Sequence, residues 1–228
     1  MRREDPNLEY LLVVASALGD LRDEIVFVGG SVAGLLITDP LAEGIRATKD
    51  VDAIVEATSF GQYHQVEKLL PALGFNRDAN CEVICRWKHS RTGVLFDLMP
   101  TDPSILGFSN RWYPEATETA TRAQLSAGVE IRVISSPTFI ATKLEAFTSR
   151  GGGDLLSSHD LEDILNVVDG RPSIVEEMGT ASDELQKFVG EQFRTLLSRP
   201  ELANYLPGLL ADENRTEIVL SRLRNLAA

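Results

Sequence analysis

The sequence predicts an α/β (α+β) protein, in which a small mixed sheet is followed by a C-terminal helical half. Two observations lead to this prediction. Short apolar runs typical of strands recur as far as Ser135, and apolar residues at helical spacing dominate from Ser136 to the end of the 228-residue chain. We therefore expect an α/β domain over residues 1–135 and a helical subdomain over residues 136–228.

The first half begins with a helix and continues with alternating strands and helices. Apolar residues at helical spacing predict an amphipathic helix between Asn7, which can cap it, and Gly19, near which it ends. Two further helices are expected at Ser31–Asp39 and Phe60–Leu73. The expected strands are Glu24–Gly30, Asp50–Glu56, Glu82–His89, Gly93–Pro100 and Val129–Ser135.

Two features complete this outline. The strands Glu82–His89 and Gly93–Pro100 flank a three-residue turn and predict an antiparallel hairpin, whereas Thr101–Thr121 reads as one long loop. The helices expected in the second half are Thr138–Ser149, His159–Val168, Ser173–Met178, Ser182–Leu197 and Thr216–Leu226.

The composition is that of a globular protein, with 43% hydrophobic and 25% charged residues. A net charge of -12 argues against a generic nucleic-acid coat, although it does not exclude a local basic patch. No apolar run approaches the roughly 20 residues that span a bilayer, so no membrane association is expected. Cys81 and Cys85 have no partners at metal-ligand spacing and indicate free thiols in a reducing, cytoplasmic compartment.

Three aspartates lie in or beside apolar strands. Asp50 and Asp52 are two residues apart, so their side chains point to the same face of a strand. Asp97 is the only charged residue between Val94 and Pro100. Unpaired buried carboxylates are costly, and Mg²⁺ prefers such hard oxygen ligands together with substrate phosphates. If the two strands are neighbours, the acids form a metal cluster typical of phosphoryl or nucleotidyl transfer; otherwise they are solvated residues at strand ends and edges.

Two further features suit a phosphate. Gly29, Gly30 and Ser31 lie where a strand meets a helix, and backbone amides there can approach an anion; the alternative is a tight turn with Ser31 as the helix cap. Lys143 lies in the otherwise apolar stretch Phe139–Phe147, so its ammonium group either snorkels to the surface or meets an anion such as a triphosphate.

Together these motifs resemble the nucleotidyltransferase superfamily: GGS, then RATKDVD (Arg46 to Asp52), then FDLMP. The long gap between Gly30 and Asp50 is similar to that of the branch whose inserted loop ends in Arg-x-Thr-x-Asp-hydrophobic-Asp. That branch is the AbiEii-type nucleotidyltransferases, which include the MenT-like toxins. FIATKLEAFTSR and SHDLEDILNVV resemble its downstream pattern, so the resemblance spans about residues 25 to 170.

The resemblance implies the nucleotidyltransferase fold and an enzyme that uses Mg²⁺ or Mn²⁺ to move an NMP group from an NTP. It implies that the metal ligands are Asp50, Asp52 and Asp97. It also implies that Lys143 and a downstream acid, Asp160 with Asp163 as its rival, complete the catalytic set. The nucleotide contacts that it implies are Gly29, Gly30, Ser31, Arg46, Thr48 and Lys143.

The acceptor is less constrained. One segment combines basic and aromatic residues and suits a tRNA-like RNA end better than a protein acceptor; the alternative is a solvated hairpin. Its members are Arg77, Arg86, Trp87, Lys88, His89 and Arg91, with Arg111, Trp112 and Tyr113 as an extension. The resemblance adds a toxin role and an antitoxin partner.

Three other functions stay open. One is a small-molecule, antibiotic-type nucleotidyltransferase. Another is an inactive binding or antitoxin-type module of the same fold, against which the three aspartates argue. The last is a phosphohydrolase, which would usually add histidine ligands, but His64, His89 and His159 lack ligand spacing.

Overall fold

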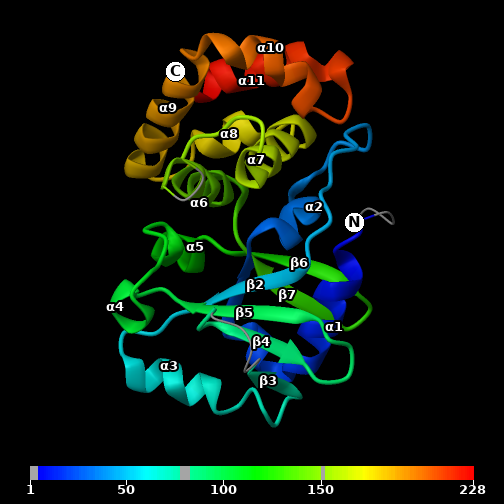
Figure 1. The fold of residues 1–228 in the computed structure, drawn as a ribbon, viewed down its shortest axis with the longest axis vertical. Helices are drawn as coiled ribbons and strands as arrows, with labels where there is room; N and C mark the ends of the chain where they lie inside the picture. Colours follow the sequence, from blue (N-terminus) through cyan, green and yellow to red (C-terminus); the bar gives the residue numbers. More distant parts are fainter. Residues whose placement is uncertain (1–4, 78–82, 150–151) are drawn as a thin grey trace. The chain divides into compact units, whose positions relative to one another are not determined.

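The computed structural model describes residues 5–77, 83–149 and 152–228 (Figure 1). The chain divides into two compact units. Residues 5–32 together with Ala47–Ser135 form the first, which we call the sheet unit. Ala33–Arg46 together with Ser136–Ala228 form the second, the helical unit. The predicted mixture of a sheet and a helical second half is confirmed.

The described residues of the sheet unit form a seven-stranded mixed sheet with the strand order β3-β4-β5-β2-β1-β7-β6. Its strands are β1 (Ile25–Val28), β2 (Asp50–Val55), β3 (Phe75–Arg77), β4 (Arg86–His89), β5 (Leu95–Pro100), β6 (Thr121–Ser126) and β7 (Val129–Val133). β2 runs parallel to β5 and β1 parallel to β7, whereas the β1–β2, β3–β4, β4–β5 and β6–β7 pairs are antiparallel.

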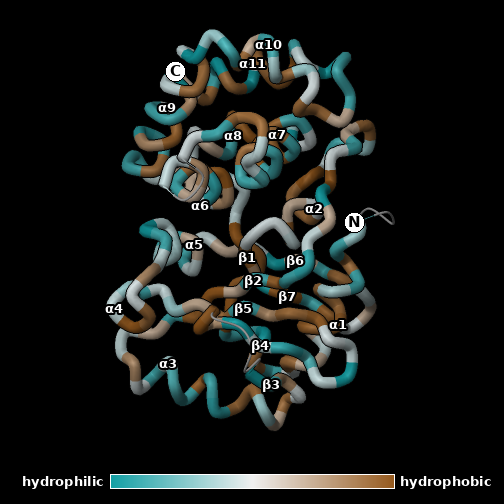
Figure 2. Tube along the Cα trace, viewed as in Figure 1, coloured by the Kyte–Doolittle hydropathy of each residue, from teal (hydrophilic) through white to brown (hydrophobic). Residues whose placement is uncertain are grey.

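Apolar strands form the middle of this sheet. All four residues of β1 are buried, as expected for a short, continuously apolar strand between two neighbours. Figure 2 shows β1, β2 and β5 mainly in the colours of hydrophobic residues. In β2, Val51 and Ala53 are buried, whereas Asp50 and Asp52 on the other face are partly exposed. Period-two alternation therefore places the acidic residues on one face of a central strand.

The helices of the sheet unit are α1 (Leu8–Leu18), α3 (Phe60–Glu67), α4 (Pro103–Leu106) and α5 (Tyr113–Glu118), with 3-10 turns at Gly19–Asp23 and Gly30–Val32. The first predicted helix is confirmed, and Asn7 is the residue at its N-cap position, although it does not cap the helix through its side chain. Within the described chain the Asn7 side chain makes no capping hydrogen bond to α1. Its Oδ1 atom instead accepts hydrogen bonds from the backbone amide and the hydroxyl of Thr48.

The predicted hairpin is confirmed as the antiparallel pair of β4 and β5, although Cys81 and Glu82 lie outside the described residues. The single long loop predicted for Thr101–Thr121 is wrong, because it contains α4 and α5. Asp102 caps α4 by accepting a 2.8 Å hydrogen bond from the Ser104 amide, a local signal that helical periodicity does not reveal in so short a helix.

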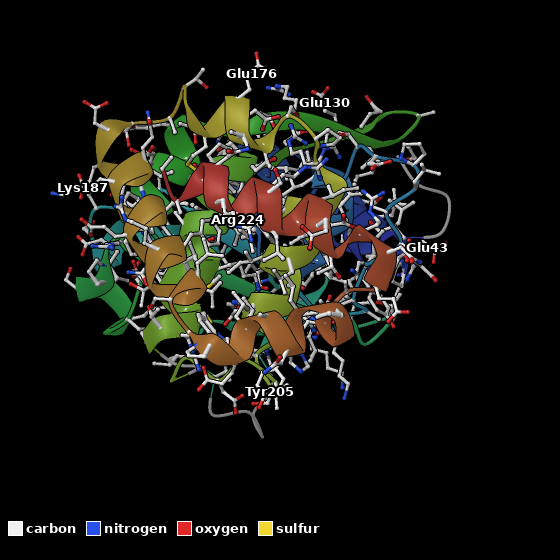
Figure 3. All side chains as sticks on the ribbon, turned by 90° about the horizontal axis from the view of Figure 1, so that it is seen from above. Glu43, Glu130, Glu176, Lys187, Tyr205 and Arg224 are labelled. Carbon is white, nitrogen blue, oxygen red and sulfur yellow. The ribbon has the colours of Figure 1, made fainter. Side chains whose placement is uncertain are left out.

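The helical unit contains α2 (Ala33–Leu36), α6 (Ser136–Ser149), α7 (His159–Gly170), α8 (Ile174–Met178), α9 (Asp183–Leu197), α10 (Pro200–Leu209) and α11 (Thr216–Leu226). The helices predicted in the second half are confirmed, and α10, which contains Pro207, is an addition. Charged side chains such as Glu176 and Lys187 project away from these helices (Figure 3). Within the described ranges, no helix combines the length and apolarity needed to cross a membrane.

The early segment Ala33–Arg46 belongs to the helical unit through specific hydrogen bonds. The backbone amides of Thr38 and Asp39 both donate to the carbonyl oxygen of Gly170, at 2.8 and 2.9 Å. The Arg215 guanidinium binds the Asp39 carboxylate at 2.6 Å. This segment is thus fastened to the C-terminal end of α7 and to the residue that precedes α11.

Candidate active site

The three aspartates predicted as metal ligands share one face of the sheet unit. Asp52 and Asp97 lie opposite each other in the register of the parallel strands β2 and β5. Asp50, two residues before Asp52, points to the same face. The structure therefore brings together the carboxylates that the sequence pattern singled out.

Arg86 lies against two of these aspartates. It is the antiparallel partner of Asp97, and its Nε and Nη2 atoms donate to the two Asp97 oxygens at 2.8 and 2.7 Å. Nη2 also donates to Asp50 Oδ2 at 2.7 Å. The sequence pattern places Arg86 in the segment of basic and aromatic residues predicted to bind the acceptor. Pairing outward from the hairpin turn, where the His89 amide donates to the Val94 carbonyl, places Arg86 opposite Asp97 and could have revealed this contact.

The oxygen ligands of this cluster suit a hard divalent cation in chemistry. One guanidinium spans Asp50 and Asp97, so both carboxylates lie within reach of a single cation. Among the described residues, however, no three His, Cys, Asp or Glu side chains are arranged to hold a metal ion. The set fits Mg²⁺ or Mn²⁺ only if Arg86 leaves the two carboxylates, and the metal assignment stays a prediction.

The glycine turn lies directly against this cluster. Gly29 has a φ angle of +73°, which favours glycine, and a Cβ atom at this position would collide with the Asp52 carboxylate. Gly30 and Ser31 are buried, and the Ser31 hydroxyl lies 3.5 Å from the Val28 carbonyl oxygen, at the outer limit of a hydrogen bond. Gly29 is therefore required by the position of Asp52.

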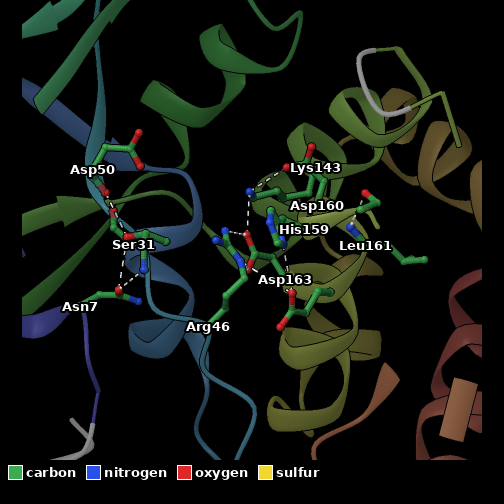
Figure 4. Close-up of polar contacts among 12 residues, drawn as sticks. Asn7, Ser31, Arg46, Asp50, Lys143, His159, Asp160, Leu161 and Asp163 are labelled. Carbon is green, nitrogen blue, oxygen red and sulfur yellow. Dashed lines mark hydrogen bonds and ion pairs between the residues drawn. The ribbon is translucent and has the colours of Figure 1, made fainter. Parts of the chain in front are cut away.

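Thr48 connects α1 with the start of β2. Its backbone amide and hydroxyl donate to Asn7 Oδ1 at 2.8 and 3.2 Å, and the hydroxyl lies 3.1 Å from the Asp50 carbonyl oxygen (Figure 4). Thr48 is buried. These contacts give Thr48 a role in positioning Asp50, and its predicted contact with the nucleotide is untested.

The helical unit holds a second ionic cluster, made of Lys143, Asp160, Asp163 and Arg46 (Figure 4). Lys143 Nζ lies 2.9 Å from Asp160 Oδ1 and 2.8 Å from Asp163 Oδ2. Arg46 donates to both oxygens of Asp163, at 3.3 and 3.1 Å. Ser158 caps α7 by accepting from the Leu161 amide, and the spacing of three residues puts Asp160 and Asp163 on one side of that helix.

Neighbouring carboxylates favour the charged forms of the two cations in this second cluster. Burial on its own would lower the pKa of Lys143, but Asp163 and Asp160 outweigh it and raise this pKa above its ordinary value. Burial likewise opposes the charge of Arg46, and Asp163 reverses this effect, so the Arg46 pKa is raised. The Asp163 side chain is 1% exposed and the Asp160 side chain 21%. Both acids proposed for the downstream position contact Lys143, and Asp163 is the buried one.

The predicted acceptor segment differs from expectation. Trp87 and Trp112 are buried, at 4% and 3% exposure, so neither ring presents a face on which a base could stack. The guanidinium groups of Arg77 and Arg111 lie 4.3 and 4.9 Å from these rings. Of the remaining basic residues, Lys88 and Arg91 are exposed. Stacking of a base on either indole ring is therefore ruled out. His89 and Tyr113, the other aromatic members, are partly exposed, and the RNA acceptor stays a prediction.

Comparison with known proteins bears on the fold. A scan against protein-family models gives no match, and neither does a search of curated proteins. Among solved structures, the chain matches the crystal structure of an antigenic nucleotidyltransferase-like protein from Paracoccidioides brasiliensis. The TM-score is 0.50 and the sequence identity 24%, over 89% of this chain and 93% of that one. The protein thus has a nucleotidyltransferase-like fold, as predicted, whereas its placement in the AbiEii-type branch stays a prediction.

Proposed function

We propose that the protein is a metal-dependent nucleotidyltransferase that moves an NMP group from an NTP to a macromolecular acceptor. The observation that supports this most is the convergence of Asp50, Asp52 and Asp97 on one face of a nucleotidyltransferase-like fold, beside the Gly29 turn. A bound Mg²⁺ or Mn²⁺ ion would neutralise charge on the transferred phosphate and orient it.

The residues of the sheet unit are proposed to have two roles, cation binding and phosphate binding. Asp50, Asp52 and Asp97 would hold the cation, and the backbone at Gly29 and Gly30 would offer amides to the phosphates. Because Gly29 has no side chain, the backbone and the Asp52 carboxylate lie in contact, which puts amide donors next to a metal ligand.

In the helical unit, Lys143 and Arg46 are proposed to bind phosphate oxygens. The raised pKa of Lys143 keeps its ammonium group charged at neutral pH, and Asp160 and Asp163 fix its position. Lys143→Met should weaken NTP binding in calorimetry, whereas Lys143→Arg should retain part of it. An unchanged dissociation constant in the Met variant would remove Lys143 from the nucleotide site without touching the role of the aspartates.

RNA is the acceptor that we favour over protein, on the basis of the exposed cations Lys88 and Arg91. A chain with a net charge of -12 repels RNA at long range, so binding through such a patch would be strongly salt-dependent. Reversing both charges should reduce labelling of RNA and leave NTP binding intact. Undiminished labelling would exclude this patch from acceptor binding.

The direct test is transfer itself. The wild-type protein is incubated with each radiolabelled NTP, Mg²⁺ and either total RNA or a protein fraction, and the labelled product identifies both donor and acceptor. Asp52→Asn and Asp97→Asn should abolish labelling, and the exposed Glu56→Gln should serve as the control. Labelling that survives in the Asp52 and Asp97 variants, or none in the wild type with any NTP, would refute nucleotidyl transfer by this site.

A toxin role with an antitoxin partner is part of the proposal and rests on the sequence resemblance alone. Induced expression should then slow bacterial growth with the wild-type chain and not with Asp52→Asn. Equal growth with both proteins would argue against it.

One observation favours a second candidate, an inactive binding module of the same fold. Arg86 takes hydrogen-bonding positions on Asp50 and Asp97 that a cation would need. In an inactive module, this ion-pair cluster would be a permanent structural element.

A further inference from the structure

The position of Arg86 in the carboxylate cluster follows from backbone pairing. β4 and β5 pair in a register that sets Arg86 opposite Asp97, so the two side chains leave the sheet on the same face. β5 and β2 then pair with Asp97 beside Asp52, and this brings the guanidinium to Asp50 as well. The contact is therefore built into three neighbouring strands.

The geometry of this contact is that of a strong ion pair. Both Asp97 oxygens accept from two different guanidinium nitrogens, at 2.8 and 2.7 Å, in the bidentate arrangement that arginine forms with carboxylates. Asp97 is buried at 6% exposure, and the Arg86 side chain is 21% exposed. Solvent therefore screens the pair only partly, and Arg86 is the more exposed of the two partners.

We propose that Arg86 is an internal counter-cation that competes with the divalent metal ion for Asp50 and Asp97. This inference rests on the proposed nucleotidyltransferase function and deepens it. Without a metal, the guanidinium neutralises part of the charge of three clustered carboxylates and stabilises them. The ion and the guanidinium use the same oxygens, so the ion binds only when Arg86 is displaced. A guanidinium released in this way would be available to bind phosphate oxygens, which are its natural partners.

The competition predicts an unusual result, namely that removing a cationic side chain strengthens metal binding. Arg86→Gln should raise the affinity of the full-length protein for Mn²⁺, measured without nucleotide by electron paramagnetic resonance or calorimetry, by about tenfold or more, because up to three charge-assisted hydrogen bonds no longer oppose it. Arg86→Lys keeps the charge without the bidentate geometry, so its Mn²⁺ affinity should lie between those of the wild type and Arg86→Gln. Arg122→Gln is the matched control, since Arg122 on the edge strand β6 binds Glu130 on the neighbouring strand β7.

A second measurement tests the competition in the wild-type protein and does not depend on Arg86→Gln. In the wild-type protein, the Nε–H resonance of Arg86, assigned by its loss in Arg86→Lys, should shift when Mg²⁺ is added, while that of Arg122 should not. The proposal would be overturned if Arg86→Gln bound Mn²⁺ only as tightly as the wild type, more weakly, or not at all. It would also be overturned if the Arg86 resonance did not shift at saturating Mg²⁺. Because none of these readouts requires transfer, failure of the competition is distinguishable from failure of the proposed activity, which the labelling assay reports.

Discussion

Lys143 and Asp163 form a 2.8 Å ion pair in the interior of the helical unit, where the Asp163 side chain is 1% exposed. Arg46, more than a hundred residues earlier in the chain, binds the same carboxylate from the early segment. Asp163 is thus held by two cations, and it fastens three parts of the chain: the early segment, α6 and α7. This makes it a structural residue of the cluster as much as a candidate for catalysis.

We predict that Asp163→Ala destabilises the protein much more than Asp160→Ala does. Removing one partner of a buried ion pair typically costs about 3–5 kcal/mol, whereas a partly exposed pair contributes roughly 1 kcal/mol or less. Urea denaturation followed by circular dichroism measures both costs. Similar values for the two variants would contradict the central position of Asp163.

The raised pKa of Lys143 predicts a stability contribution that disappears only in strong base. For a lysine whose pKa is higher in the folded state, stabilisation is fully present below its unfolded pKa of about 10.4 and is lost as the pH rises through the higher folded value. The difference in unfolding free energy between wild type and Lys143→Met should therefore be constant from neutral pH to about pH 9 and shrink above about pH 10.4. A difference that already declines below about pH 9 would indicate a lowered pKa instead.

Gly29→Ala should damage the cluster through a collision, beyond the cost of its backbone conformation. A Cβ atom there would strike the Asp52 carboxylate, whereas one at Gly128, which also has a positive φ, would meet no atom of the described residues within 4 Å. We expect Gly128→Ala to cost roughly 1–2 kcal/mol of stability from strain alone, and Gly29→Ala to cost more and to abolish nucleotide transfer. Equal losses of stability together with retained transfer in Gly29→Ala would show that Asp52 moves aside freely.

Cys85 should be unreactive in the folded protein. It is buried, and desolvation, followed by the nearby charges of Asp97 and Asp52, raises the pKa of its thiol to about 12. Only about one thiol in ten thousand is then ionised at about pH 8, and the thiolate is the reactive form. In a Cys81→Ser background, Ellman's reagent should label Cys85 slowly in buffer and rapidly in denaturant. Rapid labelling without denaturant would mean that this part of the sheet unit opens readily.

Much of the fold could be predicted from local patterns. Period-two alternation put Asp50 and Asp52 on one face, and helical spacing located α1, α7 and α9. The missed elements carry little such signal: β6 has the largely polar sequence TRAQLS, and β3 is only three residues long. Their strand structure depends on neighbours in the sheet, which periodicity within one segment does not reveal.

The sequence pointed to the acids of the candidate site more directly than to the contacts that its cations make. Carboxylates in apolar strands are conspicuous, whereas the partner of Arg86 depends on hairpin register and that of Lys143 on how α6 and α7 pack. A sequence pattern likewise could not tell that Trp87 and Trp112 face inward. Tertiary pairing decided each of these positions.

The membership of Ala33–Arg46 in the helical unit has a consequence for how the chain folds during synthesis. This segment is synthesised well before its partners: the carboxylate that Arg46 binds follows 117 residues later, and the arginine that binds Asp39 follows 176 residues later. At a synthesis rate of roughly 5–20 residues per second, Asp163 is added roughly 6–23 seconds after Arg46. Throughout that interval the residues to which Ala33–Arg46 binds have not yet been synthesised, so the helical unit can complete its folding only after Arg215 has been added to the chain.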